Sequence, residues 1–386
     1  MKRILMYTND RIYTTERMTG GIKRFKMLYD GLIELGYNVT LYCGESERDL
    51  KKYNANAHSI NREIKKSRFF PSIEIYFKNK KIIKKLKKDN YDEVIVFDVP
   101  TAIGLCFNHL KNINLFMRQD LIEYRKIKLN ENKKNKIYSF FYIKFMSLCE
   151  NICCRQSKTI ILQCDYDLKN LLARHKLISN SIKKKAFIQI NNVNAPWIVE
   201  NSKIRIENEI KRNKFNICFI GDFSSNRKGH DIFLLAIEQL LKNSYNVNAY
   251  LIGDGKQLDE IKKKYKEYNN IFFLGRLKNP IQIIKQSNLV VVPSRADSCP
   301  NTVLESLYNN TLVIGSNAGG IPEILNNNDM LFDLNEESLY KKICELYNDK
   351  KYYDKLLKKQ EKRKQELNFF WVKKIVDLLG WCDYEK

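Results

Sequence analysis

Short runs of consecutive apolar residues recur along the chain, and the segments between them are long enough for a helix. A strand that is apolar at consecutive positions is covered on both faces, as in a parallel sheet packed under helices. Two sets of six such runs predict an α/β protein with two doubly wound domains. The runs span residues 4–7, 39–42, 94–97, 115–117, 160–162 and 187–190, then 215–220, 249–252, 271–274, 289–292, 312–314 and 330–332.

The length of the chain also favours two domains. A chain of 386 residues exceeds the size of one ordinary core. The polar segment 198–214 lacks a strand pattern, so we expect domains at 1–205 and 206–365 with the boundary inside this segment. Residues 366–386 are expected to form a closing helix that packs on a domain, because their apolar residues have helical spacing. These residues are Phe369, Phe370, Trp371, Val372, Ile375, Val376, Leu378 and Leu379.

The positive charge of the chain is concentrated in its first half. The formal net charge is +24, and residues 1–205 carry 40 Lys and Arg against 20 Asp and Glu. Residues 206–386 carry 28 against 24, so we expect negatively charged partners for the first half. The sequence has no apolar run of about 18 residues, no signal-peptide core and no nucleic-acid-binding motif. We therefore expect a cytoplasmic protein without a nucleic-acid partner.

The cysteines do not suggest a disulfide framework. Ten cysteines are scattered through apolar segments, as is typical of reduced core thiols. Cys149, Cys153 and Cys154 form the one cluster, which could lie inside a helix or bind a metal. No histidine is close to them in sequence, so the spacing favours the helix interior. The sequence predicts neither a metal nor a cofactor.

In the second half, glycine and small polar or charged residues follow five consecutive apolar runs. Ligands of open α/β sheets bind at the carboxyl ends of strands, and such residues let the backbone approach a phosphate or sugar closely. Arg227 and Lys228 could clamp a diphosphate or be a solvated pair. Gly253-Asp254-Gly255 lacks the third glycine of a dinucleotide fingerprint and is often only a turn. The segments are 221–229, 253–255, 275–276, 293–305 and 315–323.

The stretch from Asp297 to Glu305 is the most informative of these segments. Pro300 is suited to the first turn of a helix, where a missing N–H costs nothing. The free N–H groups of that turn and the helix dipole would face an anion. Glu305, about one turn into the helix, could accept hydrogen bonds from ribose hydroxyls. The alternative is a capped structural helix with a surface glutamate.

The order of these motifs resembles the donor site of the retaining GT-B glycosyltransferases of family 4. The resemblance rests on Pro293-Ser294, an acidic residue, seven intervening residues and Glu305, followed by Leu312–Ser316 and Gly319–Glu323. It extends back through Phe273–Leu277, Leu251–Gly255 and Arg227–Gly229. It is clear over 215–325 and faint in the first half, where Gly20-Gly21 precede a helix. It implies two Rossmann-like domains that face a central cleft.

The resemblance also implies roles for particular residues. Glu305 would hold the ribose, Lys228 with Arg227 the diphosphate, and Asp297 would lie beside the transferred sugar, so that Asp297, Glu305 and Lys228 form the catalytic set. The other implied donor-binding residues are Gly21, Gly253, Gly255, Arg276, Ser298, Cys299, Pro300, Asn301 and Thr302.

The implied reaction is a metal-independent, retaining transfer of a sugar from a nucleotide sugar, UDP-linked rather than GDP-linked. The acceptor would be a glycan or a lipid-linked substrate of cell-surface polysaccharide or glycoconjugate synthesis. The alternative is a non-catalytic nucleotide-sugar-binding protein.

Three positions depart from the family pattern. Asp297 stands where glutamate is usual, and Asp222 stands where many members have arginine. After the fourth predicted strand, Arg118-Gln119-Asp120 replaces a common histidine. Arg118 and Asp120 could bind the acceptor sugar, or they could form a structural ion pair.

Two segments of the basic half have the pattern of amphipathic helices. In 73–88 one helical face carries Ile75, Tyr76, Ile82, Ile83 and Leu86, and lysines fill the others. Residues 137–154 are rich in Tyr and Phe and are flanked by Lys133, Lys134, Lys136 and Arg155. With Lys183, Lys184 and Lys185, these segments could dock on an anionic membrane surface. The alternative is that both are ordinary domain helices with solvated lysines.

Overall fold

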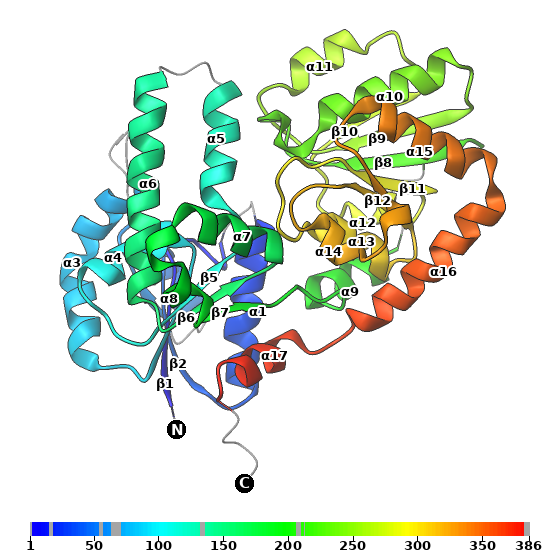
Figure 1. Ribbon diagram of the computed structural model, residues 1–386. Helices are drawn as coiled ribbons and strands as arrows, with labels where there is room; N and C mark the ends of the chain where they lie inside the picture. Colours follow the sequence, from blue (N-terminus) through cyan, green and yellow to red (C-terminus); the bar gives the residue numbers. More distant parts are fainter. Residues whose placement is uncertain are drawn as a thin grey trace. The chain divides into compact units, whose positions relative to one another are not determined.

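The chain folds into two compact units, each an α/β structure (Figure 1). Unit 1 comprises Met1–Ile122, Asn135–Gln189 and Trp371–Lys386, and unit 2 comprises Glu123–Lys134 and Ile190–Phe370. The computed structural model describes residues 2–14, 18–53, 57–62, 71–131, 136–205, 210–211 and 213–381.

The sheet of unit 1 has seven strands in the order β3-β2-β1-β4-β5-β6-β7, and every pair is parallel. All six strands predicted in this half are present. The sequence pattern missed β3, because this edge strand has only three residues and one of them is exposed. The strands are β1 (Arg3–Tyr7), β2 (Asn38–Cys43), β3 (Ala57–Ser59), β4 (Glu93–Phe97), β5 (Ile113–Met117), β6 (Thr159–Leu162) and β7 (Ala186–Ile188).

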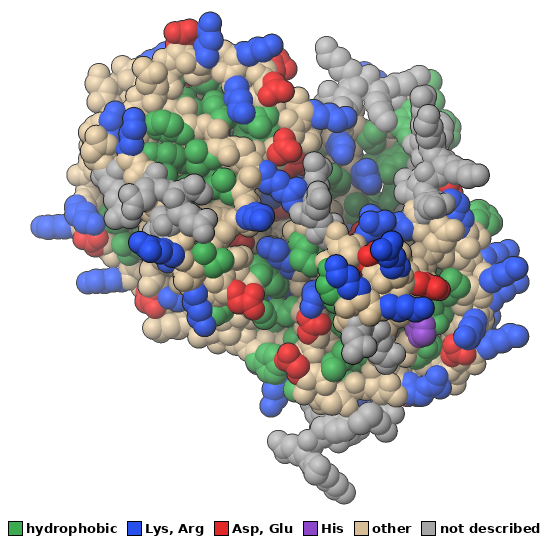
Figure 2. Space-filling model, turned by 180° about the vertical axis from the view of Figure 1, so that it is seen from behind, with side chains coloured by type: hydrophobic (Ala, Val, Ile, Leu, Met, Phe, Trp, Pro, Cys, Tyr) green, Lys and Arg blue, Asp and Glu red, His purple; other side chains and the backbone are tan. Residues whose placement is uncertain are grey.

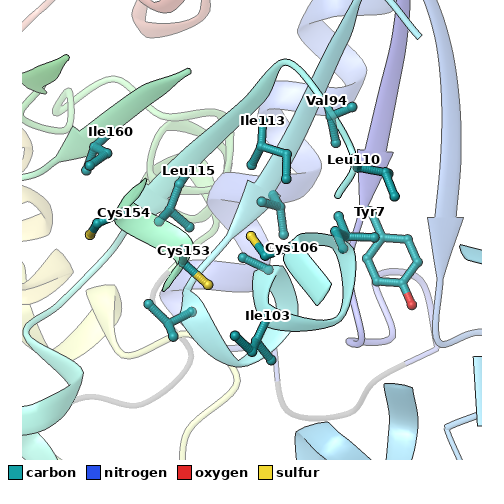
Figure 3. Close-up of a cluster of buried hydrophobic side chains, with 14 of the residues drawn as sticks. Tyr7, Val94, Ile103, Cys106, Leu110, Ile113, Leu115, Cys153, Cys154 and Ile160 are labelled. Carbon is teal, nitrogen blue, oxygen red and sulfur yellow. The ribbon is translucent and has the colours of Figure 1, made fainter. Parts of the chain in front are cut away.

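Helices cover this sheet and form one large apolar core with it. In the core the thiols of Cys106, Cys153 and Cys154 lie among aliphatic side chains (Figure 3). The helix-interior interpretation of the cysteine cluster is therefore confirmed. The helices are α1 (Gly20–Glu34), α2 (Glu47–Lys52), α3 (Pro71–Asp89), α4 (Val99–Phe107), α6 (Lys136–Gln156), α7 (Asp165–Arg174), η1 (Lys176–Ile178), α8 (Ser179–Lys183) and α17 (Trp371–Leu378).

The sheet of unit 2 has six parallel strands in the order β10-β9-β8-β11-β12-β13. These are the six strands predicted in the second half, so the prediction of two doubly wound sheets is confirmed. The strands are β8 (Phe215–Ile220), β9 (Val247–Ile252), β10 (Ile271–Gly275), β11 (Leu289–Val292), β12 (Leu312–Ser316) and β13 (Leu331–Phe332).

The helices of unit 2 include two segments that the sequence placed in the first domain. These segments are α9 and α5 from Glu123 onward. The helices are α5 (Leu121–Glu131), α9 (Pro196–Lys203), η2 (Asn226–Lys228), α10 (His230–Lys242), α11 (Leu258–Lys264), α12 (Ile281–Ile284), α13 (Asn301–Tyr308), α14 (Ile321–Leu325), η3 (Asn328–Met330), α15 (Glu336–Asn348) and α16 (Lys350–Glu366).

The limits of the units differ from the expected 1–205, 206–365 and 366–386. Helix α9 packs on α12 and α13, and Asn279 Nδ2 donates to Asn201 O at 2.9 Å, so the longer segment of unit 2 begins at Ile190 and not at 206. The tail contains the end of α16 and the short helix α17, which packs on α1 in unit 1. The expected packing of the tail on a domain is therefore present, with a shorter helix.

Candidate functional site

In the sheet of unit 2, strands β8 and β11 are neighbours, and the strand order reverses between them. Strand β8 leads to β9 and β10 on one side, whereas β11 leads to β12 and β13 on the other. Such a reversal opens a crevice at the carboxyl ends of the two strands, and ligands of doubly wound sheets bind there. The segments after β8 and β11 are 221–229 and 293–300, which the sequence predicts as donor-binding segments.

Three charged side chains from these two segments contact one another. Arg227 Nη1 donates to Asp297 Oδ1 at 2.8 Å, and Lys228 Nζ donates to Asp297 Oδ2 at 2.5 Å. All three side chains are largely buried, with exposed fractions between 13% and 21%. The predicted diphosphate clamp and the predicted sugar-side carboxylate therefore belong to one cluster, which we name the Asp297 cluster.

The charges of the Asp297 cluster shift its pKa values. Burial by itself would raise the pKa of Asp297, but Lys228 and Arg227 together lower it to about 2. Burial lowers the pKa of Lys228, and Asp297 opposes that change. The carboxylate is consequently ionised at every physiological pH.

Arg227 is fixed by further contacts. Its Nη1 atom also donates to the carbonyl of Ala296 at 3.0 Å, and its guanidinium lies 5.3 Å from the ring centroid of Tyr124. Tyr124 lies in α5, about one hundred residues earlier in the chain, and no local sequence signal pointed to it. An arginine stacked on an aromatic ring and held by two acceptors is pre-organised, which reduces the entropy lost on binding an anion.

Backbone hydrogen bonds and tight packing hold the segment after β11 against the segment after β8 and against the start of α14. Arg295 N donates to Arg227 O at 2.8 Å, and Gly320 N donates to Asp297 O at 2.8 Å. Gly229 has φ 75°, and a Cβ atom there would lie 1.9 Å from the carbonyl oxygen of Pro293. Only glycine fits at this position, so the glycine after Arg227-Lys228 is required for the approach of the two loops.

A second ion pair, beside the Asp297 cluster, joins the segment after β11 to α10. Arg295 Nη1 and Nη2 donate to the two carboxylate oxygens of Asp231 at 2.8 and 2.7 Å. This bidentate pair joins the segment after β11 to the first turn of α10. The sequence analysis missed both residues, although Arg295 lies within a motif that it quoted.

Helix α13 follows the Asp297 segment. Pro300 is its N-terminal cap residue, so the predicted start of the helix is confirmed. Glu305 is only 8% exposed, and the alternative of a surface glutamate is wrong. Ser298 is buried, and Cys299, Asn301 and Thr302 are half-buried in the same stretch.

The remaining predicted donor residues of unit 2 lie at the ends of β9 and β10. Gly253 packs so closely on the segment after β8 that a Cβ atom would lie 1.8 Å from the carbonyl oxygen of Gly221. Gly255 packs on Phe223 in the same way. Arg276 is exposed and follows β10, at the edge of the sheet. The two glycines therefore pack against the segment after β8, whereas Arg276 lies further along the sheet.

In unit 1 the structure separates Arg118 from Asp120. Arg118 pairs with Asp98, through Nε at 2.7 Å and through Nη2, and its guanidinium packs on Gly21. Asp120 is buried and accepts from Arg174 Nη1 at 2.7 Å. The suggested Arg118–Asp120 ion pair is therefore wrong.

Asp120 belongs to a buried structural network. Arg174 Nε also donates to Glu150 Oε2 at 2.9 Å, and His175 Nε2 lies 2.8 Å from the same oxygen. Asp120 accepts from the backbone N–H of Ile122 as well, at the start of α5. These contacts account for a buried carboxylate without a bound sugar.

The structure also places the basic segments that the sequence marked. In α3 the apolar residues Ile75, Ile83 and Leu86 are buried in unit 1, whereas the lysines at 80, 81, 84 and 85 are exposed. Lys185 donates to the carbonyls of Arg155 and Ser157 and has a structural role. In the part of the chain that the structure describes, no helix is both long and apolar enough to span a bilayer.

Two doubly wound units in one chain are the architecture of the GT-B class of glycosyltransferases. Residues 214–349 match the family model of glycosyl transferases group 1. The chain accordingly has a GT-B glycosyltransferase fold.

Individual relatives agree with this assignment. The chain is 27% identical to an uncharacterized glycosyltransferase of Methanocaldococcus jannaschii, over 64% of this chain and 60% of the relative. It is 24% identical to the capsular polysaccharide biosynthesis glycosyltransferase CapH of Staphylococcus aureus, over 61% and 62%. Each alignment thus spans less than two thirds of the relative. HepE of Anabaena in complex with UDP-glucose superposes with a TM-score of 0.69 at 15% identity, covering 99% of both chains.

Proposed function

We propose that this protein is a retaining glycosyltransferase that moves a sugar from a nucleotide sugar, UDP-linked rather than GDP-linked, to a glycan or lipid-linked acceptor. The pathway is the synthesis of a capsule, O-antigen or related cell-surface glycan. The Asp297 cluster is the observation that carries this proposal. The relatives support the pathway, because CapH is named for capsular polysaccharide biosynthesis, and HepE supports the donor, because it was solved with UDP-glucose.

The chemistry follows from the charges of the cluster. Arg227 and Lys228 are two cations opposed by one carboxylate, so the cluster retains an excess of donors for a diphosphate. When the bond between the sugar and the diphosphate breaks, negative charge develops on the leaving phosphate. Fixed cations stabilise this charge without reorganisation, and we propose that they do so in place of a metal ion. Glu305 then holds the ribose.

In the proposed retaining mechanism the acceptor attacks the face of the sugar that the diphosphate leaves. An oxygen of the leaving phosphate takes the proton of the acceptor hydroxyl as the new glycosidic bond forms. Asp297 lies beside the sugar in this scheme, and its ionised carboxylate stabilises the cationic sugar ring. No protein base is required.

Unit 1 is proposed to dock on the anionic inner face of the cell membrane, where a lipid-linked acceptor would lie. The supporting surface is the N-terminal half of α6, where Ile137, Phe140 and Phe141 are 57–66% exposed. Lys136 and Lys144 lie among them, and Lys144 is 5.6 Å from the ring of Phe140. On the face of the molecule in Figure 2, Lys and Arg side chains are far more frequent than Asp and Glu. Exposed aromatic residues with lysines suit the interface of an anionic bilayer.

A donor screen tests the proposed function. UDP, GDP, their sugar conjugates and random double-stranded DNA are titrated by ligand-observed NMR, and transfer to glycan acceptors is followed with and without EDTA. Tight binding of UDP-sugars, weak binding of DNA and EDTA-resistant transfer are expected. Binding without hydrolysis or transfer to any acceptor would favour a non-catalytic nucleotide-sugar-binding protein.

A further inference from the structure

Unit 1 has a switch point of its own, and charged residues gather there too. Its sheet reverses between β1, which leads to β2 and β3, and β4, which leads to β5, β6 and β7. Asp98 directly follows β4, and Gly21 lies in the first turn of the helix after β1. Arg118 follows β5, the next strand. Ligands are expected in such a crevice by the same rule that applies to unit 2.

Asp98 holds Arg118 through both of its carboxylate oxygens. Oδ1 accepts from the backbone N–H of Arg118 at 3.0 Å, and Oδ2 accepts from Nε at 2.7 Å and from Nη2. The guanidinium also lies 5.6 Å from the ring of Phe97. Its position is therefore determined on two sides, and the carboxylate of Asp98 fixes its direction.

The backbone of Asp98 adopts a conformation that glycine usually occupies. Its φ and ψ are 63° and 149°, although it is not a glycine. The strained backbone places the carboxylate beneath the end of β5, where the N–H of Arg118 is available. Residues that keep such strain cluster at ligand sites, where the direction of a side chain matters more than local stability.

One end of the Arg118 guanidinium remains available. The described residues offer no hydrogen-bond acceptor to Nη1, and the side chain is 24% exposed. Nη1 lies over Gly21, where a Cβ atom would be 1.4 Å from it. Because Asp98 already neutralises the guanidinium, this donor suits an uncharged hydroxyl oxygen better than a second phosphate.

We propose that Asp98 is a positioning residue that holds Arg118 over Gly21, so that Nη1 donates a hydrogen bond to a hydroxyl oxygen of a bound sugar ring. This inference rests on the proposed function. The sugar belongs either to the donor or to the acceptor, and the two sources give different results in the experiment below.

The test compares the wild type with Asp98→Asn, which keeps the shape of the side chain and removes the ion pair. Binding of UDP, UDP-glucose and UDP-N-acetylgalactosamine is measured by calorimetry. If the sugar is that of the donor, the affinity for at least one UDP-sugar falls about tenfold while the affinity for UDP is unchanged. If it is that of the acceptor, all three affinities are unchanged, and the KM for the acceptor rises about tenfold with little change in kcat. Unchanged UDP-sugar affinity together with unchanged acceptor KM would overturn the inference.

A matched control separates positioning from structural support. Glu93, at the opposite end of β4, is also a buried carboxylate paired with a cation, since Lys158 Nζ lies 2.5 Å from its Oε1. Glu93→Gln is expected to lower thermal stability and to leave every affinity and KM unchanged. Equal changes in both variants would reduce Asp98 to a structural role.

Two further readouts complete the experiment. The double variant Asp98→Asn with Arg118→Gln should bind sugar no more weakly than Arg118→Gln alone, because the two residues act as one unit. Additive losses would contradict the inference. Failure of the wild type to bind UDP would instead refute the proposed function, which makes the two failures distinguishable.

Discussion

Lys228 is the residue whose role is most directly testable, because its ammonium contacts Asp297 and its proposed partner is the diphosphate. Lys228→Ala should weaken UDP by about 10- to 100-fold, the loss expected for one charged hydrogen bond in a largely buried site. Uridine, which has no phosphate, should bind to the wild type and to the Lys228→Ala variant with equal affinity. Calorimetric titration of the two ligands measures the difference.

Lys242 provides a control for this experiment. It is an exposed lysine of unit 2 that pairs with Glu238 on the same helix. Lys242→Ala should leave both affinities unchanged. A loss of uridine binding equal to that of UDP in Lys228→Ala would assign Lys228 to the structure of the loop.

Replacement of Glu305 should lower the affinity for uridine as well as for UDP, unlike replacement of Lys228. Its proposed partner is the ribose, which UDP and uridine share, so Glu305→Gln should weaken both by a similar factor of about 10 to 100. Glutamine is preferred to alanine because Glu305 is 8% exposed and alanine would leave a cavity. Unchanged uridine affinity in a folded variant would sink the ribose assignment.

Asp297 should confer an acid-sensitive part of the stability. Its pKa in the folded protein is about 2, below the ordinary value of about 3.9 in unfolded chains. The stabilisation is therefore complete above about pH 4 and is lost as the pH falls towards 2. Asp297→Asn should be less stable than wild type by roughly 2 kcal/mol at pH 7, and the difference should vanish near pH 2. Urea unfolding at several pH values measures it, and a constant difference would contradict the assigned pKa.

The sequence predicted the residues of the Asp297 cluster because each lies a few positions after an apolar strand. It did not predict the partner of Arg118. Asp98 lies twenty residues earlier, directly after the neighbouring strand β4, and their contact depends on the register that pairs Phe97 with Phe116. A local pattern contains no information on that register. Tyr124 was missed for the same reason.

At the scale of elements, α6 exposes four large apolar side chains among the described residues, those of Ile137, Phe140, Phe141 and Leu148. Phe140→Ser with Phe141→Ser should reduce co-sedimentation with vesicles of anionic phospholipid at least several-fold, because both rings are more than half exposed. Glutamate at residues 80, 81, 84 and 85 of α3 should also abolish binding, as should high salt, if the charge of unit 1 contributes.

Leu177 offers the matched control for this experiment. It is 97% exposed and lies in η1, away from α6 in the sequence, so Leu177→Ser should leave vesicle binding unchanged. Vesicles of neutral phospholipid should not bind the wild type. If the wild type fails to sediment with anionic vesicles at low salt, a soluble acceptor becomes the better account.

The two amphipathic segments show what a sequence pattern can and cannot predict about a helix. Both form helices as expected, but the pattern could not tell whether an apolar face is covered. In α3 Ile83 packs on Gly104 of α4, so this face belongs to the core. In the first half of α6, by contrast, the side chains of Ile137, Phe140 and Phe141 are more than half exposed. Coverage depends on which helices become neighbours, which the spacing within one helix does not determine.

At the scale of the whole molecule, the chain leaves unit 1, builds unit 2 and returns. Helix α17 packs on α1, where Val372 lies against Gly31 and the ring of Trp371 lies 5.7 Å from the Arg24 guanidinium. Deleting residues 371–386 should therefore destabilise unit 1, although these residues follow unit 2. Hydrogen exchange should rise in α1 and β2 and remain unchanged in β8 and β11. The reverse pattern would show that the tail supports unit 2.

The return of the chain also brings its first and last described residues together. Lys2 Nζ lies 5.9 Å from the ring of Trp381, and the hydroxyl of Tyr37 donates to the carbonyl of Trp381 at 2.9 Å. A short peptide could join these ends and close the backbone into a ring. New ends could then be opened in an exposed loop, which gives a circular permutant with the same contacts.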